Sequence, residues 1–327
     1  MSSRITNSIL SSNYLRNMNR NMNNMQTLQN QLASGKAINK ASDNPYKASR
    51  SMQLNGEISY NKQYNENIKD TSNWLDTTDT ALSQMGNIFG RIETLLVNAG
   101  NGAYGDDERS AIQDEIKEKV NELSQVLNTS FDGSYIFGGT KTNSKPTTVV
   151  DGVLQYADKD GNGIGNNGTI AITDTDVQNQ LSMDLQVDIA QGVKTTYNKT
   201  TVDVLEFTDK SGNTINVSDL LTNIIDNLDS SDQTKINQLS SENLSDIQSV
   251  TVNLLKHRSE VGSFQNRMES AQEANETQNY NMTDILSKTE DIDFAEKTMQ
   301  YSMMQTVYTA ALQTSAKILP MTILSYL

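Results

Sequence analysis

Two neighbouring stretches in the middle of the sequence carry residue types that could bind a cation or a nucleotide. Asp158, Asp160 and Asn162 imitate the opening of a calcium-binding loop, but Thr169 stands where that loop needs a bidentate acid. A hairpin loop is therefore predicted, with an incidental weak cation site as the alternative. Residues 163–168 match the pattern GxGxxG, which binds dinucleotides only between a strand and a helix. Because a strand-like stretch follows, a turn-rich loop is predicted here too.

Two further candidates lie closer to the C-terminus. His257 is flanked by Lys256 and Arg258, and a lone imidazole beside two cations makes a poor metal site, so we expect a surface or interface residue of a helix. An acidic run could hold a metal or act in acid–base catalysis; it comprises Glu290, Asp291, Asp293 and Glu296. The run coincides with a predicted helix start, where carboxylates stabilise the helix dipole, and this structural role is favoured.

Composition narrows the function classes. Among 327 residues, 26 are Lys or Arg and 40 are Asp or Glu, which gives a net charge of −14, and there is one His and no Cys. Disulfides, thiol catalysis and cysteine zinc sites are excluded, and the negative charge repels nucleic-acid phosphates. No stretch is apolar enough for a membrane span or a signal peptide. We expect no enzyme, no metal or cofactor, and neither nucleic acid nor membrane as a partner.

The helices that must position these residues are predicted from mainly apolar residues that recur at alternating spacings of four and three. The longest such seam comprises Tyr64, Ile68, Thr71, Leu75, Thr78, Leu82, Met85, Phe89, Ile92 and Leu96. A 3.5-residue repeat of this kind is typical of coiled coils. The same spacing recurs in residues 15–32 and, with polar interruptions at Arg258 and Gln265, in residues 244–268. Long paired helices are therefore expected near both ends of the chain.

Helix boundaries follow from capping residues. Gly35 is expected to end the first helix, and Ser42 or Asp43 to cap a second that starts at Pro45. A further helix is predicted over residues 112–127, and a last helix after Asp291 or Asp293, which Pro320 should end or kink.

The middle of the chain has a different pattern, with β-branched runs between Gly, Asn and Asp turns. The predicted strands are residues 147–150, 169–173, 185–189, 202–207 and 214–217. The expected fold is mainly α: a long antiparallel helical coiled-coil bundle formed by N- and C-terminal arms, with a small inserted β domain. Residues 43–140 and 241–285 would form a helical rod domain, and residues 141–240 a β-rich outer domain.

Several motifs resemble the bacterial flagellin superfamily, and most closely its hook–filament junction branch. They are LASGKAI at 32–38, SDNP at 42–45, GSYIFGG at 133–139, VGSFQNRME at 261–269 and LSKTEDIDFAE at 286–296. The resemblance covers about residues 1–140 and 240–327. It implies terminal assembly helices, residues 1–42 and 286–327, that are disordered in the free monomer and fold on assembly.

The resemblance also implies a function. It indicates a structural subunit at the hook–filament junction, located outside the cell in the flagellum and exported without a cleaved signal peptide. The implied partners are further copies of the subunit in a ring, flagellin, the adjoining hook-associated protein and an export chaperone. Filament flagellin itself and a coiled-coil adhesin or binding protein remain alternatives. The expected assembly interface comprises Ile5, Leu15, Met18, Met22, Met25, Leu28, Leu32, Met304, Val307, Leu312, Ile318, Leu319, Ile323 and Leu324.

Overall fold

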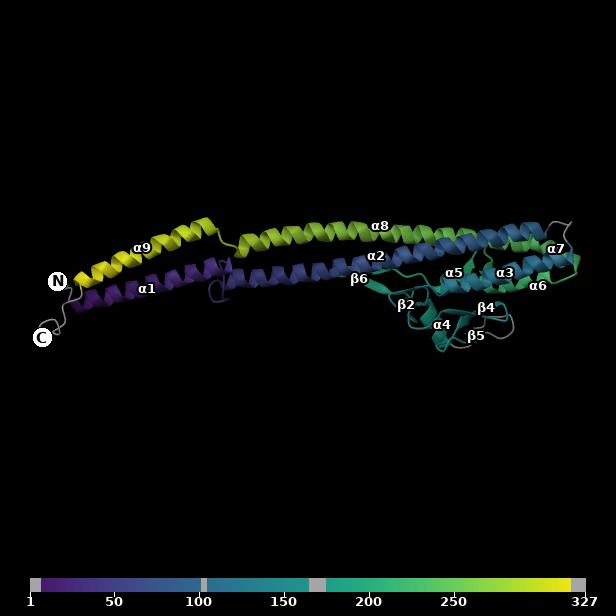
Figure 1. Cartoon of the computed structure of the whole chain (residues 1–327), viewed down its shortest axis with the longest axis horizontal. Coiled ribbons are helices and arrows are strands. Elements are labelled where there is room, and N and C mark those ends of the chain that lie inside the picture. The colour runs from purple at the N-terminus through teal and green to yellow at the C-terminus, as the bar shows by residue number, and fades with distance from the viewer. Residues whose placement is uncertain (1–6, 101–104, 165–174, 319–327) are drawn as a thin grey trace. The chain divides into compact units, whose positions relative to one another are not determined.

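The computed structural model describes residues 7–100, 105–164 and 175–318 (Figure 1). The chain divides into two compact units, the first made of residues 1–60 and 277–327 and the second of residues 61–276. Helices α2 (Pro45–Ala99) and α8 (Glu242–Glu290) contribute residues to both units. Among the helices of the described residues, none combines the length and the apolar character needed to cross a membrane.

The first unit is built on α1 (Asn7–Ser34) and α9 (Phe294–Ile318), which lie side by side and run in opposite directions (Figure 1). Asp293 begins α9, because its Oδ1 accepts hydrogen bonds from the backbone N–H groups of Ala295 and Glu296. This confirms one of the two predicted caps of the last helix. A small apolar cluster of Leu54, Ile58 and Met282 joins α2 to α8 within this unit.

The start of α2 corrects a predicted cap. Asn44, rather than Ser42 or Asp43, caps the helix, because its Oδ1 accepts the backbone N–H of Lys47 at 3.1 Å. Pro45 takes the first helical position, where its missing N–H costs nothing. The cap is the residue directly before the first helical position, and that residue is Asn44. The Asp43 carboxylate instead accepts two backbone N–H groups of the preceding turn.

The second unit packs α2, α3 (Asp106–Leu127) and α8 around one apolar core. Every residue of the long predicted seam after the half-buried Tyr64 is buried, which confirms the seam. The polar interruptions on α8 have partners on α2. The Arg258 guanidinium binds the Asp79 carboxylate at 2.9 and 3.2 Å, and the Gln265 amide donates to Asp76 at 2.7 Å.

The inserted region forms small antiparallel sheets, with short helices between them. The strands are β1 (Ser130–Phe131), β2 (Ser134–Tyr135), β3 (Thr147–Val150), β4 (Val153–Ala157), β5 (Gly163–Ile164), β6 (Gln186–Ala190), β7 (Val193–Thr196), β8 (Glu206–Thr208) and β9 (Thr214–Asn216). β1 pairs with β2, β4 with β3 and β5, β6 with β7, and β8 with β9. The helices are α4 (Thr175–Ser182), α5 (Thr201–Leu205), α6 (Val217–Leu228) and α7 (Gln233–Leu239).

One predicted strand, residues 202–207, is wrong. Its first four residues belong to helix α5, and only its last two enter β8. Thr200 and Asp203 form a reciprocal cap: the Thr200 hydroxyl accepts the Asp203 N–H at 3.1 Å, and the Asp203 carboxylate accepts the Thr200 N–H at 3.0 Å. This cap outweighs the β preference of the valines. The predicted strand 169–173 lies outside the described residues.

The hairpin predicted around Asp158 is confirmed, and a similar sequence forms a second hairpin. Residues 153–164 read VLQYADKDGNGI and residues 204–215 read VLEFTDKSGNTI. In both loops one aspartate Oδ1 accepts the backbone N–H groups two and four residues later at 2.8 Å. Gly161 and Gly212 occupy the same left-handed position, with φ of 86° and 88°. The loops are two copies of one hairpin.

The aromatic–glycine turn after α3 is packed tightly. Phe137 is fully buried, and its carbonyl accepts both the N–H and the hydroxyl of Thr201 at 2.8 Å. Gly139 has a φ of 59°, and a Cβ added there would lie 2.3 Å from the Gln180 carbonyl oxygen. Only glycine fits this position. The turn therefore joins the helices to the inserted region.

Candidate assembly interface

α1 and α9 contact each other through one seam. Apart from Gln31, the residues of α1 that are half-buried or buried follow the alternating spacing of three and four; they are Ser11, Tyr14, Met18, Asn21, Met25, Leu28 and Leu32. On α9, apart from Gln300, the corresponding residues are Lys297, Tyr301, Met304, Tyr308 and Ala311. The Tyr14 hydroxyl donates to the Ala311 carbonyl, which fixes the antiparallel register. Met18, Met25, Leu28, Leu32 and Met304 of the expected interface thus belong to the contact between these two helices.

The other expected residues of known exposure point away from that seam. Leu15, Met22, Val307 and Leu312 are exposed, and so are Ile9, Met299 and Met303, which the expected interface does not include. We call these seven side chains the outward apolar set; their exposed fractions lie between 44% and 66%. Their signal in the sequence is the spacing of four on α9, at Met299, Met303 and Val307.

Some expected interface residues cannot be placed. Ile5, Leu319, Ile323 and Leu324 lie outside the described residues, and so does Pro320. Ile318 ends α9, but its side chain is outside the description.

Few charges accompany the outward apolar set. Within α1 the charged residues are Arg16 and Arg20, and within α9 they are Glu296, Lys297 and Lys317. The remaining polar side chains are mainly amides and hydroxyls. Exposed apolar residues on a charge-poor surface are typical of the buried centre of a protein–protein interface. This surface is therefore suited to bind other protein surfaces.

A polar contact joins the segments that follow α1 and precede α9. We call residues 35–37 together with 290–292 the α1–α9 junction. Within it, the Ala37 N–H donates to the Glu290 carbonyl at 2.6 Å, and the Ile292 N–H donates to the Gly35 carbonyl at 3.1 Å. Gly35 has a φ of 72° there, as expected for a glycine that ends a helix.

The Glu290 side chain completes the α1–α9 junction. It is largely buried, and its two oxygens accept the Lys36 ammonium at 2.7 Å and the Ser51 hydroxyl at 2.5 Å. Burial raises the pKa of Glu290, but the Lys36 and Ser51 contacts outweigh it and leave that pKa below its ordinary value. The acidic run is therefore divided: Asp293 caps α9 as predicted, whereas Glu290 ends α8 and binds Lys36.

The remaining sequence candidates take structural positions. His257 is buried on α8, with Nε2 at 3.0 Å from the Asp203 carbonyl and Nδ1 at 3.5 Å from the Glu260 carboxylate. Burial, followed by the Lys199 charge, lowers its pKa. Asp158 accepts three hydrogen bonds from within its own hairpin, and these lower its pKa. No group of three or more His, Cys, Asp or Glu side chains within the described residues could hold a metal ion.

Comparison with known proteins agrees with this architecture. Residues 5–142 match the bacterial flagellin N-terminal helical region, and residues 244–327 match the bacterial flagellin C-terminal helical region. The flagellin of Clostridium tyrobutyricum is 24% identical, with 91% of this chain and 94% of the relative covered. The flagellin of Bacillus subtilis is 25% identical, with 91% and 90% covered.

Solved structures show the same fold. Flagellar hook associated protein-3 from Legionella pneumophila superimposes with a TM-score of 0.58 at 14% identity, covering 72% of this chain and 98% of that chain. FlgL from Xanthomonas campestris gives a TM-score of 0.57 at 15% identity, covering 72% and 99%. Together the two helical regions span most of the sequence on either side of the inserted strands. The chain therefore belongs to the bacterial flagellin family, whose members are structural proteins of the flagellum.

Proposed function

We propose that the chain is a subunit of the hook–filament junction and that it assembles through the outward apolar set. The observation that carries this proposal is the exposure of seven large apolar side chains on a charge-poor helix pair. Burying such a side chain fully against a neighbour contributes about 1.5–3 kcal/mol. Several such contacts per subunit would offset the entropy lost when a subunit joins a ring.

The partners in this proposal are further copies of the chain, flagellin on one side and the adjoining hook-associated protein on the other. An export chaperone would bind the chain before export, which would proceed without a cleaved signal peptide to the flagellum outside the cell. The fold shared with the two hook-associated structures supports the junction position. The chain acts by shape and helix contacts rather than by catalysis.

Filament flagellin is the second candidate, because the sequence relatives that align over nearly their full length are flagellins. A deletion strain separates the two functions. Loss of a junction subunit leaves hooks without filaments and releases flagellin into the medium, whereas loss of the filament protein leaves no flagellin to release. Electron microscopy of the cells and immunoblotting of the medium read out both results.

Two adjacent methionines test the assembly surface. Met303 is exposed, whereas the neighbouring Met304 is half-buried against α1. Met303 is thus free to contact a partner, and Met304 contributes to the α1–α9 contact. Met303→Gln keeps the helix propensity and should change the free energy of unfolding by less than about 0.5 kcal/mol. It should nevertheless abolish filament attachment in the complemented deletion strain. Met304→Gln is the matched control, which should lower the stability of the α1–α9 pair itself.

The proposal fails if Met303→Gln restores filaments as well as the wild-type chain does. It also fails if Met303→Gln blocks attachment only because it unfolds α1 and α9, which circular dichroism of the purified variant would reveal.

A further inference from the structure

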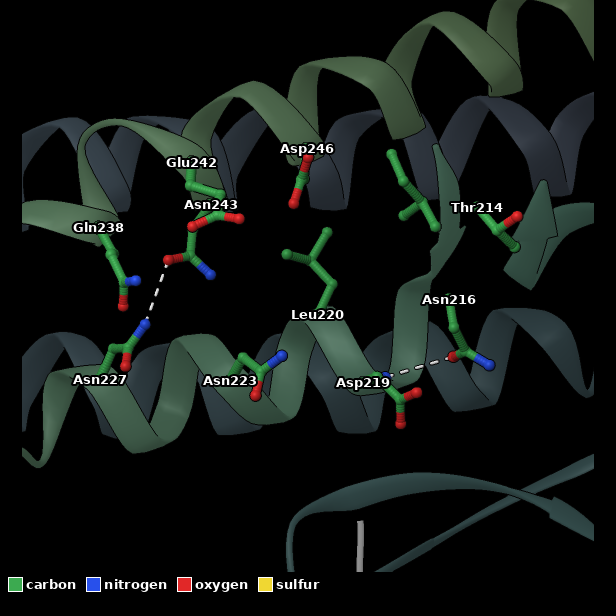
Figure 2. A pocket seen from close by; sticks show the side chains of 11 residues that line it. Thr214, Asn216, Asp219, Leu220, Asn223, Asn227, Gln238, Glu242, Asn243 and Asp246 are labelled. Carbon is green, nitrogen blue, oxygen red and sulfur yellow. Dashed lines mark hydrogen bonds between the residues drawn. The ribbon is translucent and has the colours of Figure 1, made fainter. Parts of the chain in front are cut away.

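The chain has no cysteine, so its 13 methionines are the side chains that mild oxidants modify first. Oxidation converts the flexible apolar thioether into a polar sulfoxide, and methionine sulfoxide reductases reverse it. The polar groove between α6 and α8 shows the contrast (Figure 2). It is lined mainly by carboxylates and amides, Asp219 and Asn243 among them, and by no methionine within the described residues. Mild oxidation therefore acts where methionines are exposed.

The structure sorts the methionines by exposure. Met299, Met303 and Met22 are 66%, 63% and 46% exposed, and all three belong to the outward apolar set. Met85 and Met268, in the core of the second unit, are fully buried. Three of the seven side chains of the outward apolar set are thus of the kind that an oxidant can make polar.

The neighbours of these exposed methionines are protected by the contact between α1 and α9. Met303 is exposed, whereas Met304, the next residue, is half-buried in the α1–α9 seam. On α1, Met22 is exposed, whereas Met18 and Met25 are half-buried in the same seam. Oxidation of the exposed side chains therefore changes the outer surface and leaves the α1–α9 contact in place.

We propose that Met22, Met299 and Met303 form an oxidation-sensitive site that controls assembly of the subunit; this inference rests on the proposed function. The oxidant is a hydroperoxide, such as hydrogen peroxide. A lone pair of the methionine sulfur attacks one peroxide oxygen, the S–O bond forms as the O–O bond breaks, and water leaves. The sulfur is oxidised by two electrons, and the peroxide is reduced by the same two.

A sulfoxide oxygen on this surface opposes assembly. It is a hydrogen-bond acceptor, and an apolar neighbour cannot satisfy it when the contact excludes water. A subunit that is oxidised before assembly is therefore excluded. In an assembled subunit the same contact covers the three sulfur atoms and slows their oxidation. The site thus responds to oxidant before assembly rather than after it.

The first measurement follows the oxidation of the purified full chain by hydrogen peroxide. Mass spectrometry with peptide fragmentation assigns each sulfoxide, because Met299, Met303 and Met304 lie in one tryptic peptide. Met303 should be oxidised at least about fivefold faster than Met304, and Met85 should stay unmodified. Equal rates at Met303 and Met304 would overturn the proposal, because the α1–α9 contact would then not determine which sulfur reacts.

The second measurement is binding of the chain to hooks isolated from the deletion strain, read by sedimentation and immunoblotting. The oxidised wild-type chain should bind at least about tenfold less than the untreated chain, and methionine sulfoxide reductases should restore its binding. The triple variant Met22→Leu, Met299→Leu and Met303→Leu keeps apolar side chains of similar volume, so it should bind equally before and after oxidation. The matched control combines Met52→Leu and Met183→Leu. These two methionines are 72% and 54% exposed but lie outside α1 and α9, so this variant should still lose binding on oxidation.

Two binding results would overturn the inference and leave the proposed function intact. They are undiminished binding of the oxidised wild-type chain and an equal loss of binding in the oxidised triple variant. The proposed function fails if the untreated chain does not bind hooks, or if Met303 is oxidised as fast in the hook-bound chain as in the free chain. The inference, which rests on that function, then fails with it.

Discussion

Replacing Glu290 by Gln should loosen the α1–α9 junction measurably. The substitution keeps the size of the side chain but removes the charge that binds Lys36 and Ser51. The side chain of Lys36 is 48% exposed, so solvent screening reduces that ion pair to about 0.5–1 kcal/mol. Weakening the buried hydrogen bond from Ser51 costs about 0.5 kcal/mol more. The total is about 1–1.5 kcal/mol.

Amide hydrogen exchange measures this loss at the junction itself. The Ala37 and Ile292 N–H groups donate across the junction, so their exchange rates report its local opening. A loss of 1–1.5 kcal/mol should speed their exchange about five- to twelvefold. Glu296→Gln, at an exposed position in the first turn of α9, is the matched control and should leave both rates unchanged. Acceleration below twofold in Glu290→Gln would refute this assignment of the contact energies.

The pH dependence of the same rates follows from the lowered pKa of Glu290. A carboxyl whose pKa is lower in the folded state stabilises it above the pKa of the unfolded chain. That contribution is lost as the pH falls through the folded-state value. The protection of the Ala37 N–H, which is the intrinsic exchange rate divided by the observed rate at the same pH, should therefore fall on acidification in the wild-type chain. This fall should be missing in Glu290→Gln.

Three further predictions concern the second unit. Gly139→Ala should lower the thermal unfolding midpoint, because the added Cβ would clash with the Gln180 carbonyl oxygen. Gly86 lies in the middle of a helix with open space around it, so Gly86→Ala should raise the free energy of unfolding by about 0.5–1 kcal/mol. Burial lowers the pKa of His257, so stability should fall as the pH drops below the unfolded-state value near 6.5; His257→Gln should flatten that part of the profile, and an unchanged profile would contradict this origin. Leu82→Ala should cost about 2–5 kcal/mol in chemical denaturation, because the side chain is fully buried.

The helical seams were predictable because helix packing leaves a repeat in the sequence that needs no knowledge of the partner. The same repeat does not show which face of a helix packs against another helix of the same chain. Leu15 and Met18 are both apolar and three residues apart, yet only Met18 lies in the α1–α9 seam. Some members of the outward apolar set could therefore be recognised only after α9 had been placed against α1.

Long-range pairing explains the other differences. The residues next to Glu290 in the sequence suggest a helix start, whereas its carboxylate binds Lys36, which is 254 residues away in the sequence. The short helix α5 was missed because valines favour strands and the Thr200–Asp203 cap occupies only four residues.

The two copies of one hairpin have a consequence for how the inserted region can change. Each copy closes its loop through its own aspartate and glycine, and its two strands pair with each other. The copies still meet at one point, where the Tyr156 hydroxyl donates to Glu206 at 3.0 Å. A unit that carries its own turn and its own pairing can be duplicated without redesign of the helices. The inserted region of this chain thus uses one hairpin geometry twice, while the helical arms are held to a length and spacing that their seams dictate.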